Sequence, residues 1–157
     1  MRAAKLTCWL ILVAVLCLGQ APAHAASKRV LLAWEKTRFK RALIEEMAQL
    51  LEAQGHTVMR LMHSKRGLEA KASDFDAVFI TNSGVHSRVR PWITKWLAAN
   101  KAQAARILLH TTQTRDWQVQ ADVDAVTSAS KKADVKRMAA DYVARLVRKM
   151  NPTPVGD

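Results

Sequence analysis

The residues that follow the first apolar run have the chemistry of an anion site. Residues 29–34 (RVLLAW) are apolar, and the next stretch carries Lys36, Thr37, Arg38 and Lys40. These four open a segment with helical periodicity, and a helix N-terminus attracts anions through its free N–H groups and its dipole. Three cations would strengthen such a site. The alternative is a solvated basic turn, since the Glu35 carboxylate would compete with an anionic ligand.

Two later loops carry side chains that could contact a flat ring. The first contains Ser83, Gly84, Val85 and His86, and His86 could stack on a ring or move a proton near neutral pH. The second begins at Thr112 and holds Trp117, which could cover a planar ligand. The alternatives are a surface histidine and a tryptophan packed on the edge of a sheet.

The elements that must position these residues begin with a βαβ unit. Residues 29–34 form a nearly continuous apolar run, as expected for a strand buried on both faces. Helical spacing then relates Phe39, Leu43, Met47, Leu50 and Leu51. Gly55 suits the left-handed residue that ends a helix, and residues 56–62 resume as a strand. This order predicts an open parallel sheet.

The remaining pattern predicts an α/β, doubly wound fold. Strands are expected over residues 74–81, 106–111 and 123–126, one helix opens at Pro91, and a last helix runs from Val135 to Met150. We expect a mostly parallel sheet of four or five strands in the order 2-1-3-4-5, with helices on both faces. The candidate loops all follow strands, which places them at the carboxyl ends where such sheets bind ligands.

The first 25 residues have the pattern of a signal peptide. Arg2 and Lys5 precede an apolar stretch that is too short for a membrane span, and a small-residue site predicts cleavage after Ala25. We therefore expect residues 1–25 to be removed, residues 26–150 to form one domain and residues 151–157 to be a tail. Localisation would be periplasmic or secreted, with no transmembrane segment after cleavage. Cys17 leaves a lipoprotein as the alternative.

The composition of the chain limits the classes of function that it can have. Both cysteines lie in the signal, which removes thiolate catalysis and cysteine metal sites from the mature chain. Cleavage leaves 23 basic and 13 acidic residues, a net charge of +10. This favours an anionic small molecule or an acidic protein as partner, and makes nucleic acid less suitable in that compartment. We find no metal-ligand spacing and no catalytic motif, so an enzyme stays open only if a cofactor carries the chemistry.

Residues 28–149 resemble the flavodoxin-like superfamily. Residues 28–58 are similar to its first strand, phosphate loop and first helix, and residues 74–97 to its third strand, flavin-side loop and following helix. The resemblance implies FMN as cofactor. In the family's T-G-x-T phosphate loop, Thr37 matches the first threonine, whereas Arg38 replaces the glycine and Lys40 the second hydroxyl residue. The family's helix between the fourth and fifth strands also has no counterpart in this sequence pattern.

Residues 123–130 (VDAVTSAS) resemble a D-x-x-[ST]-G-A-T motif that carries covalent FMN in some exported proteins, with Ser130 at the acceptor position. The other interpretation makes Ser130 an ordinary helix N-cap. Two functional hypotheses result. One is an exported flavodoxin-like module that holds FMN or another anionic planar ligand in a redox role. The other is a flavodoxin-like scaffold or partner-binding protein that has lost flavin.

Overall fold

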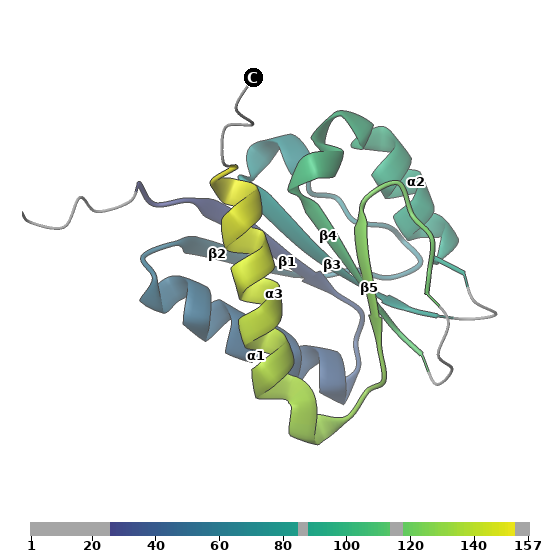
Figure 1. The fold of residues 1–157 in the computed structure, drawn as a ribbon. Helices are drawn as coiled ribbons and strands as arrows, with labels where there is room; N and C mark the ends of the chain where they lie inside the picture. Colours follow the sequence, from purple (N-terminus) through teal and green to yellow (C-terminus); the bar gives the residue numbers. More distant parts are fainter. Residues whose placement is uncertain (1–25, 85–87, 114–117, 153–157) are drawn as a thin grey trace, which may run out of the picture.

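The computed structural model describes residues 26–84, 88–113 and 118–152, which form five parallel strands and three α-helices (Figure 1). The strands run in the order β2-β1-β3-β4-β5, as predicted. Their bounds are β1 Arg29–Trp34, β2 Thr57–Met62, β3 Ala77–Ser83, β4 Ile107–Thr112 and β5 Asp124–Ser128. All pairings within this sheet are parallel, so "mostly parallel" understated its regularity.

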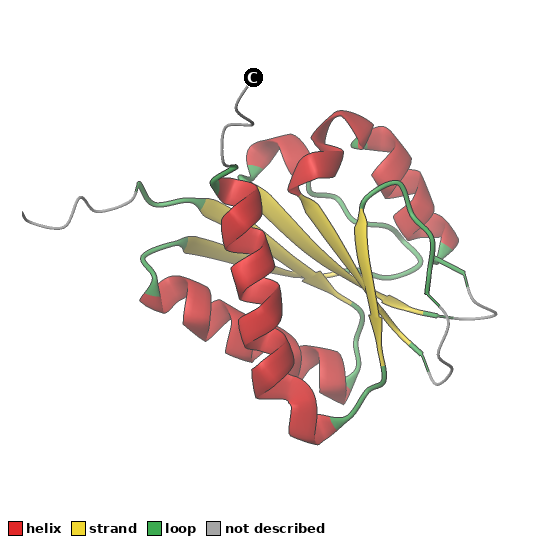
Figure 2. Ribbon diagram, in the orientation of Figure 1, coloured by secondary structure: helices red, strands yellow, loops and turns green. Residues whose placement is uncertain are grey.

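Helices cover both faces of the sheet, which confirms the doubly wound prediction (Figures 1 and 2). Helices α1 (Arg38–Ala53) and α3 (Val135–Met150) pack side by side on one face, over buried residues such as Leu32 and Phe79. Helix α2 (Pro91–Ala99) lies on the other face, with the 3₁₀ turns η1 (Ala72–Asp74) and η2 (Lys101–Arg106).

Local sequence explains why α1 begins and ends where it does. The Thr37 hydroxyl accepts a hydrogen bond from the Lys40 amide at 3.2 Å and caps the helix. The predicted stripe is confirmed, because Leu43, Met47 and Leu51 are fully buried. After the helix, Gly55 has a φ of +83°, which a residue with a Cβ adopts only with strain.

The last helix starts differently from the prediction. Ser130 does not cap it: a 3₁₀ turn, η3 (Lys132–Asp134), comes first, and Asp134 occupies the N-cap position of α3. Ser130 is exposed in the loop before that turn. Strand β5 ends two residues later than expected, since Thr127 and Ser128 continue the pairing with β4. The predicted buried residues of α3 from Val135 to Met150 are confirmed.

The α2 face is less completely covered than the α1/α3 face. The described residues between β4 and β5, which are Gln113 and residues 118–123, contain no helix, and the chain there runs as a loop (Figure 2). Val119 of this loop is buried, and its amide donates to the Thr127 hydroxyl of β5 at 3.3 Å. None of the helices in the described ranges has the length and hydropathy to cross a membrane.

Candidate functional site

The strands end together at one side of the sheet, which we call the carboxyl edge: Trp34, Ser83, Thr112 and Ser128 are the last residues of β1, β3, β4 and β5. Helix α1 leaves β1 toward one face, and α2 follows β3 onto the other. The direction of winding therefore reverses between β1 and β3. In open α/β sheets ligands bind at this reversal, beyond the carboxyl ends of the strands.

A partly buried polar cluster occupies the reversal point, and we call it the Glu35 cluster: Glu35, Lys40, Ser83 and Arg90. The Lys40 ammonium donates to the Glu35 carboxylate and, at 2.7 Å, to the Ser83 hydroxyl. Ser83 donates in turn to the Glu35 carboxylate at 2.6 Å. The Arg90 guanidinium lies 3.7 Å from the other Glu35 oxygen. Lys40 is only 1% exposed, so its charge is paired inside the protein and does not face solvent.

Burial and ion pairing act in opposite directions on the pKa values of Glu35 and Lys40. Burial alone would raise the pKa of Glu35, but hydrogen bonds from Lys40 and Ser83 and the Lys40 charge outweigh it and lower that pKa. Burial lowers the pKa of Lys40, and the adjacent Glu35 carboxylate opposes much of this shift. A buried ammonium needs such a partner, because an unpaired charge in the interior costs several kcal/mol.

The start of α1 retains two free cations. Lys36, Thr37 and Arg38 are exposed, and Thr37 already uses its hydroxyl as the helix cap. As the first residues of α1, Arg38 and Phe39 have amides with no acceptor within the helix. Of the four residues predicted there, Lys36 and Arg38 therefore point their charges to solvent, whereas Lys40 is directed into the Glu35 cluster. Exposed cations and free helix amides are the groups through which a helix N-terminus attracts a phosphate.

The loop after β3 joins the same region. Ser83 belongs to the Glu35 cluster, and the Gly84 amide donates to the Thr112 carbonyl at 2.9 Å. A Cβ on Gly84 would stand 3.2 Å from side-chain atoms of Thr111 and Gln113, so a larger residue there would require those side chains to shift. Thr112 is buried, with its hydroxyl 3.4 Å from the Asn82 carbonyl. The predicted residues Val85, His86 and Trp117 lie outside the described residues.

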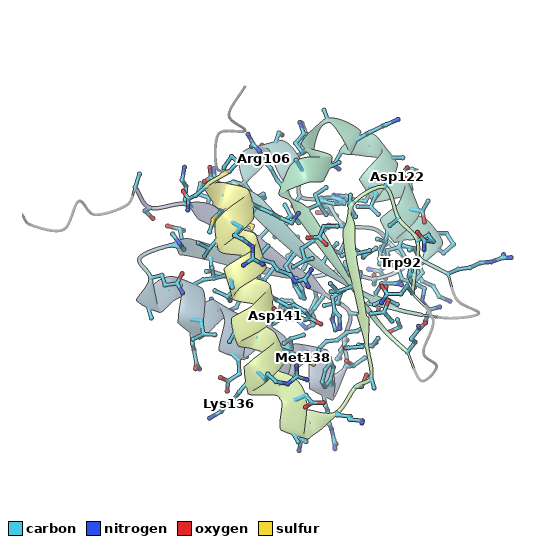
Figure 3. The ribbon with its side chains drawn as sticks, in the orientation of Figure 1. Trp92, Arg106, Asp122, Lys136, Met138 and Asp141 are labelled. Carbon is cyan, nitrogen blue, oxygen red and sulfur yellow. The ribbon has the colours of Figure 1, made fainter. Side chains whose placement is uncertain are left out.

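Sequence reasoning missed a second polar chain beneath the site. Trp92 of α2 (Figure 3) donates its indole N–H to His63 Nδ1 at 3.2 Å, so the proton of the neutral ring is on Nε2, which donates to the Thr81 carbonyl at 2.8 Å. Burial lowers the pKa of His63, although the Glu35 charge opposes this. No local pattern signals this chain, because its members come from three separate segments.

A buried histidine lies further along the carboxyl edge. The His110 ring packs among Phe39, Phe79 and Tyr142, with centroid separations of 5.1 to 6.5 Å. Its Nε2 is 2.8 Å from the Ser128 hydroxyl, while Nδ1 has no hydrogen-bond partner among the described residues. Burial, with the Lys40 charge nearby, lowers the pKa of His110 to about 3. The ring is therefore neutral at physiological pH.

Comparison with solved structures defines the class of fold. Flavodoxin 2 from Bacillus cereus matches with a TM-score of 0.53 and 7% identity, over 77% of this chain and 99% of that one. A flavodoxin from the domain Archaea gives 0.52 and 8%, over 77% and 98%. An oxidoreductase from Corynebacterium diphtheriae gives 0.52 and 8%, over 80% and 98%. The chain thus has the flavodoxin-like fold, as its sequence resemblance predicted.

Sequence comparison adds nothing beyond the fold, since no family profile and no curated protein matches this chain. Within the described residues, no group of three or more His, Cys, Asp or Glu side chains could hold a metal ion.

Proposed function

We propose that this protein is an exported flavodoxin-like module that binds FMN, or a similar anionic planar ligand, at the carboxyl edge. The observation that carries the proposal is the start of α1. Exposed Lys36 and Arg38 stand beside two unpaired helix amides at the reversal point of a flavodoxin-like sheet. Charge, free donors and fold all favour a phosphate-bearing ligand there.

In this proposal the described residues hold the ligand and FMN supplies the redox chemistry. Lys36, Arg38 and the first amides of α1 would bind the phosphate group. Gly84 lets the loop after β3 lie against Thr111 and Gln113, and the flat ring would lie beside the loops after β3 and β4. Bound flavin transfers electrons, and the protein contributes position and electrostatics. Lys40 would act on the ligand through its charge and not through a direct contact, because its ammonium group already donates hydrogen bonds to Glu35 and Ser83.

The same cluster supports the second candidate function, a scaffold or partner-binding protein that has lost flavin. Only three residues connect β1 with α1, and one of them, Glu35, places a carboxylate beside the phosphate position. Its ion pair with Lys40 needs no ligand to satisfy it. The positive charges of Lys36, Arg38 and Arg90 still outnumber that carboxylate locally, which is why we rank flavin binding first.

The test is a titration of the mature protein with FMN, followed by flavin fluorescence. Arg38→Glu should weaken FMN binding tenfold or more, because a charge-assisted contact contributes about 1.5–3 kcal/mol and about 1.4 kcal/mol is a factor of ten. Arg148→Glu is the matched control: it makes the same charge change on an exposed residue in the last turn of α3. Riboflavin, which lacks the phosphate, should respond equally to both variants.

The outcomes separate the two functions. FMN binding that is weakened only by Arg38→Glu supports the flavin module. If FMN binds saturably and Arg38→Glu does not weaken it, the protein is still a flavin module, but the FMN phosphate does not bind at the start of α1. Absence of FMN binding at high micromolar concentration leaves the scaffold function ahead.

A further inference from the structure

A cleft with no role in the proposed FMN site runs along α2. It has a volume of about 770 Å³, within the range of small-molecule pockets, and lies between α2 with η2 and residues 118–123. Apolar side chains dominate its wall: Val89, Leu97, Ala98, Ala121 and Val123. Several of these pack on the core cluster of the α2 face, so the cleft is a continuation of that core.

The cleft lies where the described residues between β4 and β5 form a loop instead of a helix (Figure 2). Val119 of this loop is buried and its amide donates to Thr127 of β5, while other residues of the loop line the cleft opposite α2. Apolar surface that stays open in this way is stabilised when an apolar group leaves water to cover it. The wall therefore favours a ligand with an apolar body.

One end of the cleft carries an exposed cation, Arg88. Asn82, fully buried at the end of β3, holds the segment around it: the Asn82 amide donates to the Arg88 carbonyl at 3.4 Å, and its oxygen accepts from the Arg90 amide at 3.1 Å. The neighbouring cation, Arg90, forms an ion pair with Glu35. Arg88 is exposed and forms no ion pair with any residue in the described ranges.

The other end of the cleft has no net charge. Lys101 follows the end of α2, and Asp122 of the facing segment (Figure 3) precedes β5, so one cation and one anion line that end. Between the two ends, the nine residues of α2 rise about 14 Å. Lys101 and Asp122 balance each other in charge, so the unbalanced charge of the cleft is Arg88, at one end of a mainly apolar channel.

We propose that this cleft binds an amphiphile with one anionic head group, of the fatty-acid class. The carboxylate pairs with Arg88, and the apolar chain lies along Leu97 and Ala98 toward Lys101. This site is independent of FMN, so the flavin titration does not decide it.

Calorimetric titration of the mature protein with decanoate tests the proposal, with decanol as the uncharged analogue. Decanoate should bind saturably, and Arg88→Gln should weaken it at least tenfold while leaving decanol unchanged. Ala98→Glu places a charge on the exposed wall and should weaken both ligands at least tenfold. The matched controls are Lys95→Gln and Ala99→Glu, exposed α2 residues that do not line the cleft.

Circular dichroism should show that all four variants stay folded, because each changes an exposed side chain. Decanoate that binds wild type, Ala98→Glu and Ala99→Glu equally would overturn the site, as would the absence of saturable binding below the micelle concentration. Loss of decanol binding in Arg88→Gln would overturn the assignment of Arg88 to the head group.

Discussion

At the scale of single residues, burial decides chemistry that residue type leaves open. Lys36 and Lys40 are both lysines near the start of one helix, yet the first is exposed and the second is paired inside the Glu35 cluster. His110 lies in a strand, stacks on Phe79 and stays neutral. These residues stabilise the carboxyl edge only in one charge state each, so the folding free energy should depend on pH.

His110 gives the clearest pH prediction. The pKa of His110 is about 3 in the folded protein and near 6.5 in the unfolded chain. Between these two pH values the unfolded chain binds a proton at His110 and the folded protein does not. The stability from this group is full above pH 6.5 and falls as the pH drops toward 3. Between pH 7 and pH 5 the loss should be about 2 kcal/mol, and His110→Phe should remove it.

Urea unfolding of wild type and His110→Phe at pH 7 and pH 5 measures this difference. The variant loses the hydrogen bond to Ser128, so its stability at pH 7 should be about 1 kcal/mol lower, while its change with pH should be smaller. An equal loss of stability with pH in both proteins would mean that His110 is protonated in the folded state.

At the scale of elements, the pairing of α1 with α3 builds the larger half of the core. Both helices bury an apolar stripe against one face of the sheet, and α3 contributes Met138, Tyr142 and Leu146. The α2 face has a shorter helix, 3₁₀ turns and a loop, which leaves the cleft described above. Stability should therefore depend more on α3 than on the segments of the α2 face.

Leu146→Asp tests the packing of α3. Leu146 is fully buried, and the substitution would place an unpaired carboxylate in the core, so we expect a loss of about 3–5 kcal/mol in unfolding free energy. Ala144→Asp puts the same group on the exposed side of the same helix and should change stability by less than about 0.5 kcal/mol. Chemical denaturation compares the two, and equal midpoints would show that α3 is not packed as described.

At the scale of the whole molecule, we propose from the positive charge and the N-terminal pattern that the protein is exported and has an anionic partner. The chain carries 25 basic and 13 acidic residues, and the described helices present many of the cations to solvent, including Lys136 of α3 (Figure 3). Such a surface attracts an anionic small molecule or an acidic protein. Export and the periplasmic or secreted location are proposals from the sequence.

Mass spectrometry of the protein made in a Gram-negative host tests export. The mature chain should begin at Ala26, because the apolar segment before it has the length of a signal and ends in a small-residue cleavage site. Fractionation should recover it outside the cytoplasm, and a substitution of Ala25 by a large residue should block cleavage. An intact Met1 would contradict export by this signal, and a lipid on Cys17 would replace the soluble form with a lipoprotein.

The sequence by itself determined the elements, their order and the class of fold. Apolar spacing in α1 and α3, continuous apolar runs in β1 and β4, and the turn residue Gly55 are local signals, and each corresponds to an element of the structure. Parallel strands joined by helices can adopt only a few topologies, which is why the order of the strands in the sheet could be predicted from the order of the elements in the chain. The boundaries of β5 and the cap of α3 did not follow, because pairing with β4 and the preceding 3₁₀ turn set them.

Tertiary structure alone decided which charged groups are free. Ser83 and Glu35 are 48 positions apart, and Lys40 donates hydrogen bonds to both. No pattern in the sequence around Lys40 therefore shows that its charge is paired. Arg88 and Arg90 differ by two positions, yet one lines the cleft and the other meets Glu35. Helical and strand periods depend on neighbours in the chain, whereas ion pairing and burial depend on neighbours in space, which only the folded arrangement of the sheet and its helices brings together.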